Sequence, residues 1–258
     1  MKQTKGIVSS RRNEILNLLA ENSEIRNEEL AEKLHTSPLT IRRDLQFLEA
    51  KGLVKRFYGG AILLKQPADS QNSTNAESIL NTKKHLIAKF AANLVEDGDT
   101  IFINTSSTAL LMLEYLGNKT VVVVTNNGKA LQSTISPNVE LVLTGGQVNS
   151  KKQSMVGDFA TYILSQITAS KCFLGVSGID IESGLSTSVL QETLVNKEMI
   201  NRSNGPVFIL ADSSKIGHHH NFSSGTIDKV SHIITDSDIS TKDIAAFESI
   251  GIKVSIVS

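Results

Sequence analysis

Residues 36–61 read TSPLTIRRDLQFLEAKGLVKRFYGGA, and this stretch decides how the N-terminal part of the chain folds. Ser37 is a good N-cap, Pro38 stands at the first helical position, and apolar side chains recur at Ile41 and then four and seven residues later. From residue 53 the apolar spacing changes to a period of two, on both sides of a Gly-Gly pair. The stretch therefore predicts a helix followed by two strands that meet at a glycine turn.

Two further helices are expected upstream of this stretch. Residues 10–20 place isoleucine and leucine side chains on one helical face. Residues 27–35 begin at Asn27, which we expect to be the N-cap, with two glutamates in the first turn, where the helix dipole favours acids. Helix, tight turn and helix make a helix-turn-helix, and the two strands would form a wing beside it. We therefore expect a small α+β winged helix-turn-helix domain over residues 1–64.

The outward face of the third helix is polar and basic, as in a helix that reads DNA. When Ile41 and the apolar residues in register with it face the core, Arg43 and Gln46 lie on the opposite face. The first turns of such a helix can approach base edges in the major groove, and arginine suits bidentate contact with guanine. The alternative is that the arginines only solubilise the helix or pair with Asp44 and Glu49. We predict operator contacts from Ser37, Thr40, Arg42, Arg43 and Gln46, and phosphate contacts from Lys55 and Arg56 on the wing.

The charge is unevenly distributed along a neutral chain. The whole sequence holds 26 basic and 26 acidic residues, but residues 1–60 hold eleven Lys and Arg against eight Asp and Glu. The N-terminal part therefore carries +3 and the remainder −3. This mild asymmetry is weak evidence by itself, and it agrees with a head that meets phosphate.

A polar stretch without a sustained apolar period separates this head from the rest of the chain. Residues 65–82 contain Pro67 and many Ser, Asn, Gln and Asp residues, so we expect a linker that ends near a helix start. Residues 83–258 then alternate short β-rich runs with helical segments, the first helix being expected at 83–96. Such alternation predicts an α/β domain with a mainly parallel sheet that is covered on both faces.

Polar and glycine-containing segments follow several of the expected strands of the α/β domain. The carboxyl ends of parallel strands lie along one edge, where ligands of open α/β sheets bind. The segment NTSST at 104–108 follows a strand and opens a helix, so its amides and hydroxyls would suit a phosphate or a sugar hydroxyl. The alternative is an ordinary Ser/Thr-rich N-cap. We predict an effector site at Asn104, Thr105, Ser106, Ser107, Thr108, Thr125, Asn126, Gly145, Gly146, Asp180, Asp212 and Lys215, where Asp212 would bind sugar hydroxyls and Lys215 would neutralise a phosphate.

Residues 36–61 closely resemble the signature of the DeoR/GlpR family of bacterial transcription regulators, above all in TIRRDL at 40–45 and GGA at 59–61. The resemblance extends over nearly the whole chain, since the Thr-Asn, Gly-Gly and Asp-Ser-Ser-Lys segments each resemble a family motif. It implies a winged helix-turn-helix whose Arg42 and Arg43 face the operator, followed by an effector domain related in fold to sugar-phosphate isomerases. It also implies a sugar-phosphate effector and a repressor of a carbohydrate-metabolism operon.

The chain departs from the family pattern in the loop at 104–108. Family members usually show an acid and a glycine there, along the lines of D-S-G-T-T, where this chain has Asn104 and Ser106. Ser170 also stands where an acid commonly precedes the Phe-Leu-Gly strand. The segment 184–187, followed by Glu192, resembles another family segment near the ligand edge, with a plain loop as the alternative.

The main rival to a regulator is an enzyme, a sugar-phosphate isomerase or hydrolase whose head serves only for localisation. Its chemistry would need a positioned carboxylate or lysine base, for which Asp180, Glu192, Asp212 and Lys215 are candidates by residue type. A third interpretation is a constitutive DNA-binding protein with a vestigial body. No P-loop, Ser-His-Asp order or dinucleotide fingerprint is present, so we expect no catalytic residue and no cofactor.

The remaining features concern location and assembly. No apolar run approaches the roughly 18 residues of a membrane helix, and no apolar segment follows the basic N-terminus, so we expect no membrane span and a cytoplasmic protein. Cys172 lies in an apolar run and predicts a buried thiol. The histidines at 218–220 predict no metal site, and their position suggests a loop over the effector cleft. Because short operators are usually read by two heads, we expect a homo-oligomer.

Overall fold

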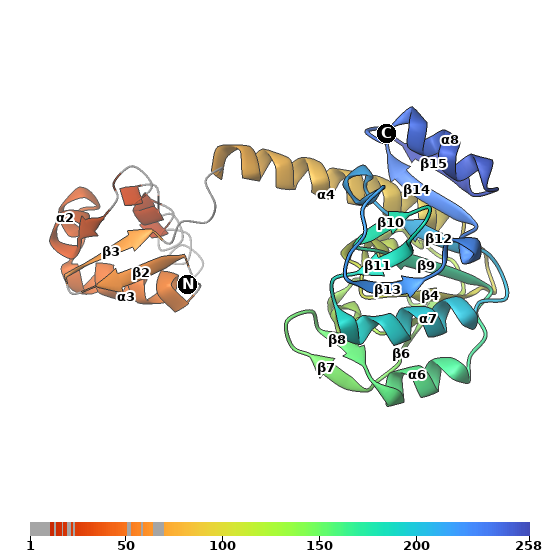
Figure 1. The fold of residues 1–258 in the computed structure, drawn as a ribbon. Helices are drawn as coiled ribbons and strands as arrows, with labels where there is room; N and C mark the ends of the chain where they lie inside the picture. Colours follow the sequence, from red (N-terminus) through yellow and green to blue (C-terminus); the bar gives the residue numbers. More distant parts are fainter. Residues whose placement is uncertain are drawn as a thin grey trace. The chain divides into compact units, whose positions relative to one another are not determined.

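The computed structural model describes residues 11–12, 14–16, 18–19, 22, 24–50, 53–57, 59–63 and 70–258. The chain divides into two compact units, Met1–Ser73 and Thr74–Ser258 (Figure 1). Two predicted features lie outside the described residues: Gly52, at which the sequence pattern predicts the end of the helix that follows Ser37, and the first part of the expected linker, 65–69.

The first unit packs helices against a small antiparallel sheet. Helical residues between 11 and 19 are followed by α2 (Asn27–Lys33) and α3 (Pro38–Ala50). The strands β2 (Val54–Phe57) and β3 (Gly60–Leu63) form the expected hairpin, and β1 (Ile25–Arg26) pairs with β3 to give the order β1-β3-β2. Apolar side chains from all these elements form one buried cluster that includes Ile15, Leu30 and Leu45.

The expectation that Asn27 is the N-cap of α2 is wrong. Asn27 is the first helical residue and is buried, and Arg26 precedes it with extended backbone and no side-chain cap. The reason is the third strand, which the sequence analysis missed. The strand β1 ends at Arg26, which takes the cap position with extended backbone, and the amide of Asn27 donates to the carbonyl of Gly59 at 2.8 Å, so the helix begins one residue earlier than expected.

The second unit is built on seven parallel strands. Their order is β15-β14-β12-β9-β4-β5-β6, and every neighbouring pair in this sheet is parallel. The five inner strands are short apolar runs that are almost entirely buried, as expected of a covered parallel sheet, whereas the edge strands β6 and β15 are partly exposed. Their bounds are β4 (Thr100–Ile103), β5 (Val121–Thr125), β6 (Val139–Leu143), β9 (Lys171–Gly175), β12 (Val207–Leu210), β14 (His232–Asp236) and β15 (Lys253–Val257).

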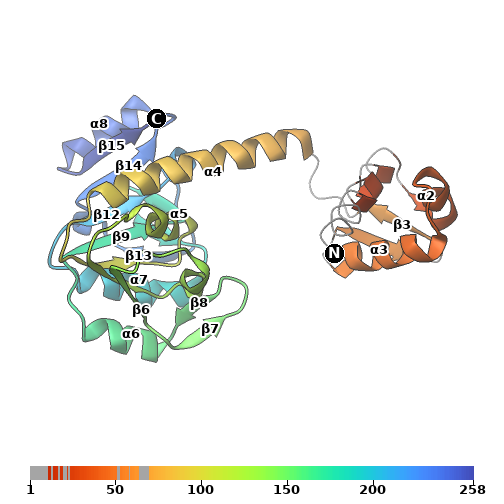
Figure 2. The ribbon, with the colours of Figure 1, turned by 180° about the vertical axis from the view of Figure 1, so that it is seen from behind.

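Helices cover both faces of this sheet, as the views from opposite sides show (Figures 1 and 2). Alternate strand residues feed two separate cores: Ile101 and Ile103 face one side, and Phe102 faces the other. The first side carries α4 (Ser70–Asn93), α5 (Ser107–Leu111) and the 3-10 turn η1 (Met112–Tyr115). The other side carries α6 (Asp158–Ser165), α7 (Thr193–Asn201) and α8 (Thr241–Ser249). The expected α/β architecture with a mainly parallel sheet is confirmed.

Several elements differ from the sequence-based expectation. The helix expected from residue 83 begins at Ser70, so much of the stretch interpreted as linker is helical. The alternating pattern of the α/β domain also predicts a helix near Lys129, but this segment is a 3-10 turn, η2 (Gly128–Gln132). Five short strands were not expected: the hairpin of β7 (Gln147–Asn149) and β8 (Ser154–Val156), and a small sheet of β10 (Gly178–Asp180), β11 (Gly184–Thr187) and β13 (Phe222–Gly225). Three more 3-10 turns complete the unit: η3 (Leu190–Glu192), η4 (Ser213–Lys215) and η5 (Ile227–Lys229).

The sequence predicted a buried thiol at Cys172 and no membrane span. Cys172 is fully buried in β9, and this burial raises the pKa of its thiol. Among the described helices, none is both long and apolar enough to cross a membrane.

Candidate DNA-binding surface and effector cavity

The N-terminus of α3 is organised by Ser37 and Thr40. The Ser37 hydroxyl accepts from the Thr40 amide at 3.2 Å, and the two hydroxyl oxygens lie 2.8 Å apart. This is the expected N-cap interaction. Beyond it, Ile41 is buried in the core, whereas Arg43 and Gln46 are exposed. The helix thus presents the polar face that was predicted to meet DNA.

Neither Asp44 nor Glu49 pairs with the arginines of the α3 surface. Asp44 is buried, and its two oxygens each accept from an arginine Nε of the first helix at 2.7 Å, one from Arg11 and one from Arg12. The Arg12 guanidinium also lies 3.7 Å from the centre of the Phe47 ring. The interpretation that Asp44 and Glu49 neutralise Arg42 and Arg43 is therefore wrong, and over the described ranges neither arginine forms an ion pair.

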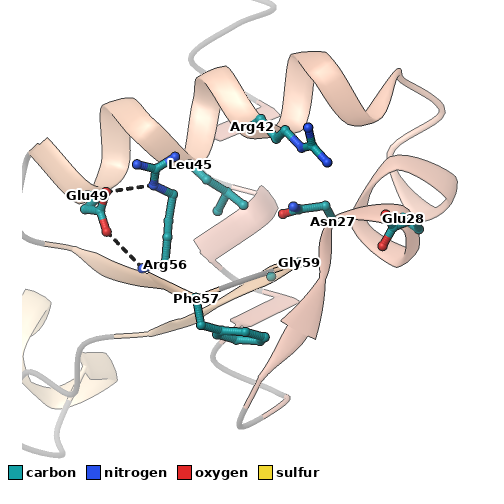
Figure 3. Close-up of a pocket in the computed structure, with 9 residues that line it drawn as sticks. Asn27, Glu28, Arg42, Leu45, Glu49, Arg56, Phe57 and Gly59 are labelled. Atoms are coloured by element: carbon teal, nitrogen blue, oxygen red, sulfur yellow. Dashed lines mark hydrogen bonds and ion pairs between the residues drawn. The ribbon is translucent and has the colours of Figure 1, made fainter.

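Glu49 instead binds Arg56 on the wing. Its carboxylate accepts from the Arg56 amide at 3.0 Å and from the Arg56 Nε at 2.7 Å, which lowers the pKa of Glu49 (Figure 3). Lys55 and Arg56 were both predicted to contact phosphate, and both are exposed. The Arg56 guanidinium is already paired with Glu49, so Lys55 is the less engaged of the two cations. A cavity of about 710 Å³ lies between α3, the start of α2 and the wing, and Arg42 reaches into it beside Asn27 (Figure 3).

The Asp44 contacts make a prediction for the stability of the head. Asp44→Asn keeps the shape of the side chain but removes a buried charge from two arginines, so we expect a loss of about 1–3 kcal/mol. Glu49→Gln is the matched control on the same helix, and because its ion pair with Arg56 is exposed we expect a clearly smaller loss. Hydrogen exchange of the α3 amides measures both values, and equal losses would contradict the assigned difference.

A second cavity, of about 490 Å³, lies at the carboxyl edge of the parallel sheet. Its walls come from the loops after β4 and β9, from η2, from the β7–β8 hairpin, from the segment between β11 and α7, and from η4. The lining residues are Asn104, Thr105, Ser106, Ser107, Lys129, Lys152, Gly175, Val176, Ser177, Thr187, Ser188, Glu192, Asn196, Lys215 and His220. The cavity therefore lies where the strand order predicted a ligand site.

Asn104 ties the loop after β4 to the neighbouring strand β9 and to α7. Its Nδ2 donates to the Gly175 carbonyl at 2.8 Å and to Oδ1 of Asn196 at 3.1 Å. Its Oδ1 accepts from the amides of Gly175 at 3.0 Å and Ser106 at 3.2 Å. A carboxylate at this position could accept but not donate. The amide in place of the usual family acid thus has a structural role in this chain.

Ser106 fills the position where the family usually has glycine. Its hydroxyl caps α5 by accepting from the amides of Thr108 at 3.2 Å and Ala109 at 3.4 Å. The same side chain packs against Gly175, where an added Cβ would lie 1.8 Å from the Ser106 Oγ. The N-cap interpretation of this segment is therefore confirmed for Ser106. Two amides that would otherwise face a bound anion are already hydrogen-bonded.

The cavity gathers some of the predicted effector residues and not others. Asn104, Thr105, Ser106, Ser107 and Lys215 line it. Thr108, Thr125, Asn126 and Asp212 are buried and are not among the lining residues. Gly145 and Gly146 have positive φ, and Asp180 closes the β10–β11 turn by accepting from the amides of Glu182 and Ser183. Contacts between these predicted residues and a ligand stay a prediction.

Asp212 does not line the cavity, but it forms an ion pair with Lys215, which does. Their side chains lie 3.2 Å apart, and the Ser214 hydroxyl also donates to the Asp212 carboxylate. Burial opposes ionisation of Asp212, but the hydrogen bond from Ser214 and the charge of Lys215 outweigh it and lower the pKa of Asp212. Asp212 is therefore an anion that holds the cavity lysine in place.

Sequence reasoning missed Lys129, Lys152 and Asn196, and it left the role of Glu192 open. The loop that follows β5 and the β7–β8 hairpin lie side by side, since the Gly128 amide donates to the Gln153 carbonyl at 2.8 Å, and each brings one lysine to the cavity. No strand-end pattern marks these positions. His220 also lines the cavity, and within the described ranges no group of side chains could hold a metal ion.

Comparison with known proteins agrees with this geometry. Residues 11–67 match the model of a DeoR-like helix-turn-helix domain, and residues 80–237 match that of the DeoR C terminal sensor domain. The chain belongs to the DeoR family of transcriptional regulators. This DeoR-family chain is therefore a DNA-binding regulator with a sensor domain, and the family gives no support to the enzyme interpretation.

Two relatives match nearly the whole DeoR-family chain. The regulator GolR of Listeria innocua is 34% identical over 249 residues, which cover 95% of this chain and 97% of GolR. The glycerol-3-phosphate regulon repressor of Escherichia coli is 30% identical over 241 residues, with 92% of each chain covered. Among solved structures, ribose 5-phosphate isomerase A of Methanocaldococcus jannaschii aligns with 52% of this chain and 53% of its own at 24% identity and a TM-score of 0.36.

The role of Asn104 makes a second stability prediction. Asn104→Asp loses two donated hydrogen bonds and sets a buried carboxylate against the Gly175 carbonyl, so we expect a loss of about 1–3 kcal/mol at neutral pH. Because burial favours the neutral acid, the deficit should shrink as the pH falls and the new carboxyl becomes protonated. Thermal unfolding at several pH values measures this, with Asn204→Asp at an exposed position outside the cavity as the control. A deficit independent of pH would contradict the assignment.

Proposed function

We propose that this chain is a repressor of a carbohydrate-metabolism operon whose affinity for operator DNA is controlled by a sugar phosphate bound in the cavity of the sensor domain. The observation that carries the proposal is the charge of that cavity. Lys129, Lys152 and Lys215 line it together with one buried acid, Glu192. Lysines suit a phosphate group, and a buried carboxylate and an amide such as Asn196 suit sugar hydroxyls.

The name of one relative supports the phosphorylated ligand. The Escherichia coli relative represses a glycerol-3-phosphate regulon by name, and it matches the chain over both units. The capped α5 terminus supports a main role for the lysines in binding the anion, since Ser106 already uses two of the amides there.

We place the operator contacts on Ser37, Thr40, Arg42, Arg43 and Gln46 of α3, with Lys55 and Arg56 on the wing near phosphate. Two observations support this placement: Arg42 and Arg43 are both exposed, and among the described residues neither has a carboxylate partner. We also propose a homo-oligomer in the cytoplasm, since two heads would read the two halves of an operator.

The first functional prediction concerns Arg43. The operator can be selected from random-sequence DNA by the protein itself, and its affinity measured over a range of salt. We expect Arg43→Ala to weaken operator binding by about 1–3 kcal/mol and to relax sequence preference. Lys55→Ala should weaken all sequences alike and reduce the salt slope by about one.

Lys89→Ala, on an exposed position of α4, is the control for these two variants and should leave binding unchanged. Unchanged affinity of Arg43→Ala at every salt concentration would remove α3 as the recognition helix.

The second functional prediction concerns the ligand. A panel of phosphorylated and unphosphorylated sugars is tested for an increase in the thermal midpoint, since a ligand of the folded state stabilises it by about 2.7 kcal/mol at one hundred times its Kd. We expect at least one sugar phosphate to raise the midpoint, its unphosphorylated form to have little effect, and Lys215→Ala to abolish the increase.

Lys242→Ala, at an exposed position of α8, serves as the control and should keep the increase. An equal increase with the unphosphorylated sugar, or one that survives Lys215→Ala, would speak against a phosphate held by this cavity.

A further inference from the structure

The carboxylate of Asp236 connects the strand β14 to the helix α4 and to the turn η4. Asp236 is the last residue of β14 and is 2% exposed. Its Oδ1 lies 2.7 Å from Nζ of Lys83 on α4. Ser213 of η4 donates through its amide to Oδ2 at 2.7 Å and through its hydroxyl to Oδ1 at 3.0 Å, and the Asp238 amide adds a bond of 3.1 Å. One buried carboxylate thus holds α4 and η4 to the same strand end.

The η4 turn is also part of the cavity wall. It consists of Ser213–Lys215, so the residue that binds Asp236 and the lysine that lines the cavity belong to one short turn. An anionic ligand would compete with Asp212 for the Lys215 ammonium, which lies 3.2 Å from that carboxylate. Ser213 directly follows Asp212 and lies two residues before Lys215, so the ion pair between those two residues and the Ser213 contacts with Asp236 share one turn of backbone.

Lys83 lies where α4 begins to pack on the sensor domain. Ile79, one turn earlier, is 59% exposed, whereas Ile87, one turn later, is fully buried. Lys83 itself is bound by Asp236 and by Asp238, whose Oδ2 lies 2.5 Å from Nζ. These carboxylates raise the pKa of Lys83. The ion pair therefore anchors the packed part of α4 at the end that is nearer in sequence to the DNA-binding head.

We infer that Lys83, Asp236 and Ser213 form the connection through which occupancy of the effector cavity reaches α4 and, along the chain, the head. The inference rests on the proposed function of the cavity. In the structure, Ser213 and Lys83 bind the same carboxylate. A ligand that draws Lys215 away from Asp212 distorts η4, weakens the Ser213 bonds and releases the anchored turn of α4. A ligand that favours one of these two arrangements must change the affinity of the head for DNA.

Hydrogen exchange of the α4 amides in the full-length protein tests this connection without ligand or DNA. Lys215→Ala is introduced into four backgrounds: wild type; Lys83→Met, which removes the charge; Lys83→Arg, which keeps it; and Lys89→Met, the matched control on an exposed part of α4. We expect Lys215→Ala to speed exchange around residue 83 by about fivefold or more in wild type, Lys83→Arg and Lys89→Met. In Lys83→Met it should have no further effect, because the connection is already broken.

The outcomes decide the inference in both directions. Equal acceleration in all four backgrounds, or none in wild type, would overturn it. Ser213→Pro removes both the amide and the hydroxyl that donate to Asp236, at the first position of η4, where the extended backbone of Asp212 accommodates a following proline. It breaks the connection at its other end and leaves Lys83 in place, so it should abolish the effect of Lys215→Ala in the same way. This variant also keeps the test decisive if Lys83→Met fails to fold.

A second experiment distinguishes failure of the connection from failure of the proposed function. The sugar phosphate that most raises the thermal midpoint of the wild type is added to operator complexes of the same single variants. Release is expected from wild type and Lys89→Met but not from Lys83→Met, which should still show the increase in midpoint. Release from Lys83→Met equal to wild type overturns the inference alone. If no sugar phosphate stabilises or releases the wild type, the proposed function fails and the exchange experiment decides the connection.

Discussion

A parallel sheet that is covered on both faces leaves its strand ends as the place where polar side chains can meet a small ligand, and the sensor domain depends on this constraint. All the neighbouring strands of the seven-stranded sheet run parallel, so the loops after β4, β5, β9 and β12 reach the same edge. The faces themselves are filled by apolar side chains beneath the covering helices. Hydrogen bonds at this edge therefore determine both the shape of the cavity and its charge.

The same constraint explains which parts were predictable. Strands such as β5, with four valines, and the helix α3, with its cap, proline and apolar period, are determined by local pattern, so their positions agree with expectation. The short strands β1 and β7 carry almost no local pattern, because they exist only through pairing with distant segments. For this reason the N-terminus of α2 was misplaced by one residue and the lysines of the cavity were not all found.

Side-chain roles at the edge were less predictable than residue positions. The strand-end pattern placed Asn104, Ser106 and Lys215 at the correct edge. It left open whether the 104–108 segment binds a ligand or caps a helix, and it did not predict that Asn104 hydrogen-bonds to the protein itself. Whether a hydroxyl faces a ligand or caps a helix depends on its rotamer and on neighbours far away in sequence. Gly175 is such a neighbour, since only a residue without a Cβ leaves room for Ser106.

Buried carboxylates connect the working parts of both units. In the head, Asp44 binds Arg11 and Arg12, and this leaves the α3 surface arginines free of a carboxylate partner among the described residues. In the sensor domain, Asp212 holds the cavity lysine and Asp236 holds the turn that carries it. A buried carboxylate is costly unless every contact to it is satisfied, so a change at one partner is transmitted to the others. The buried acids Asp44 and Asp212 thus influence which arginine and lysine side chains can bind DNA or a ligand at the surface. A DNA-binding protein that responds to a small molecule needs such a link between its interior and its binding surfaces.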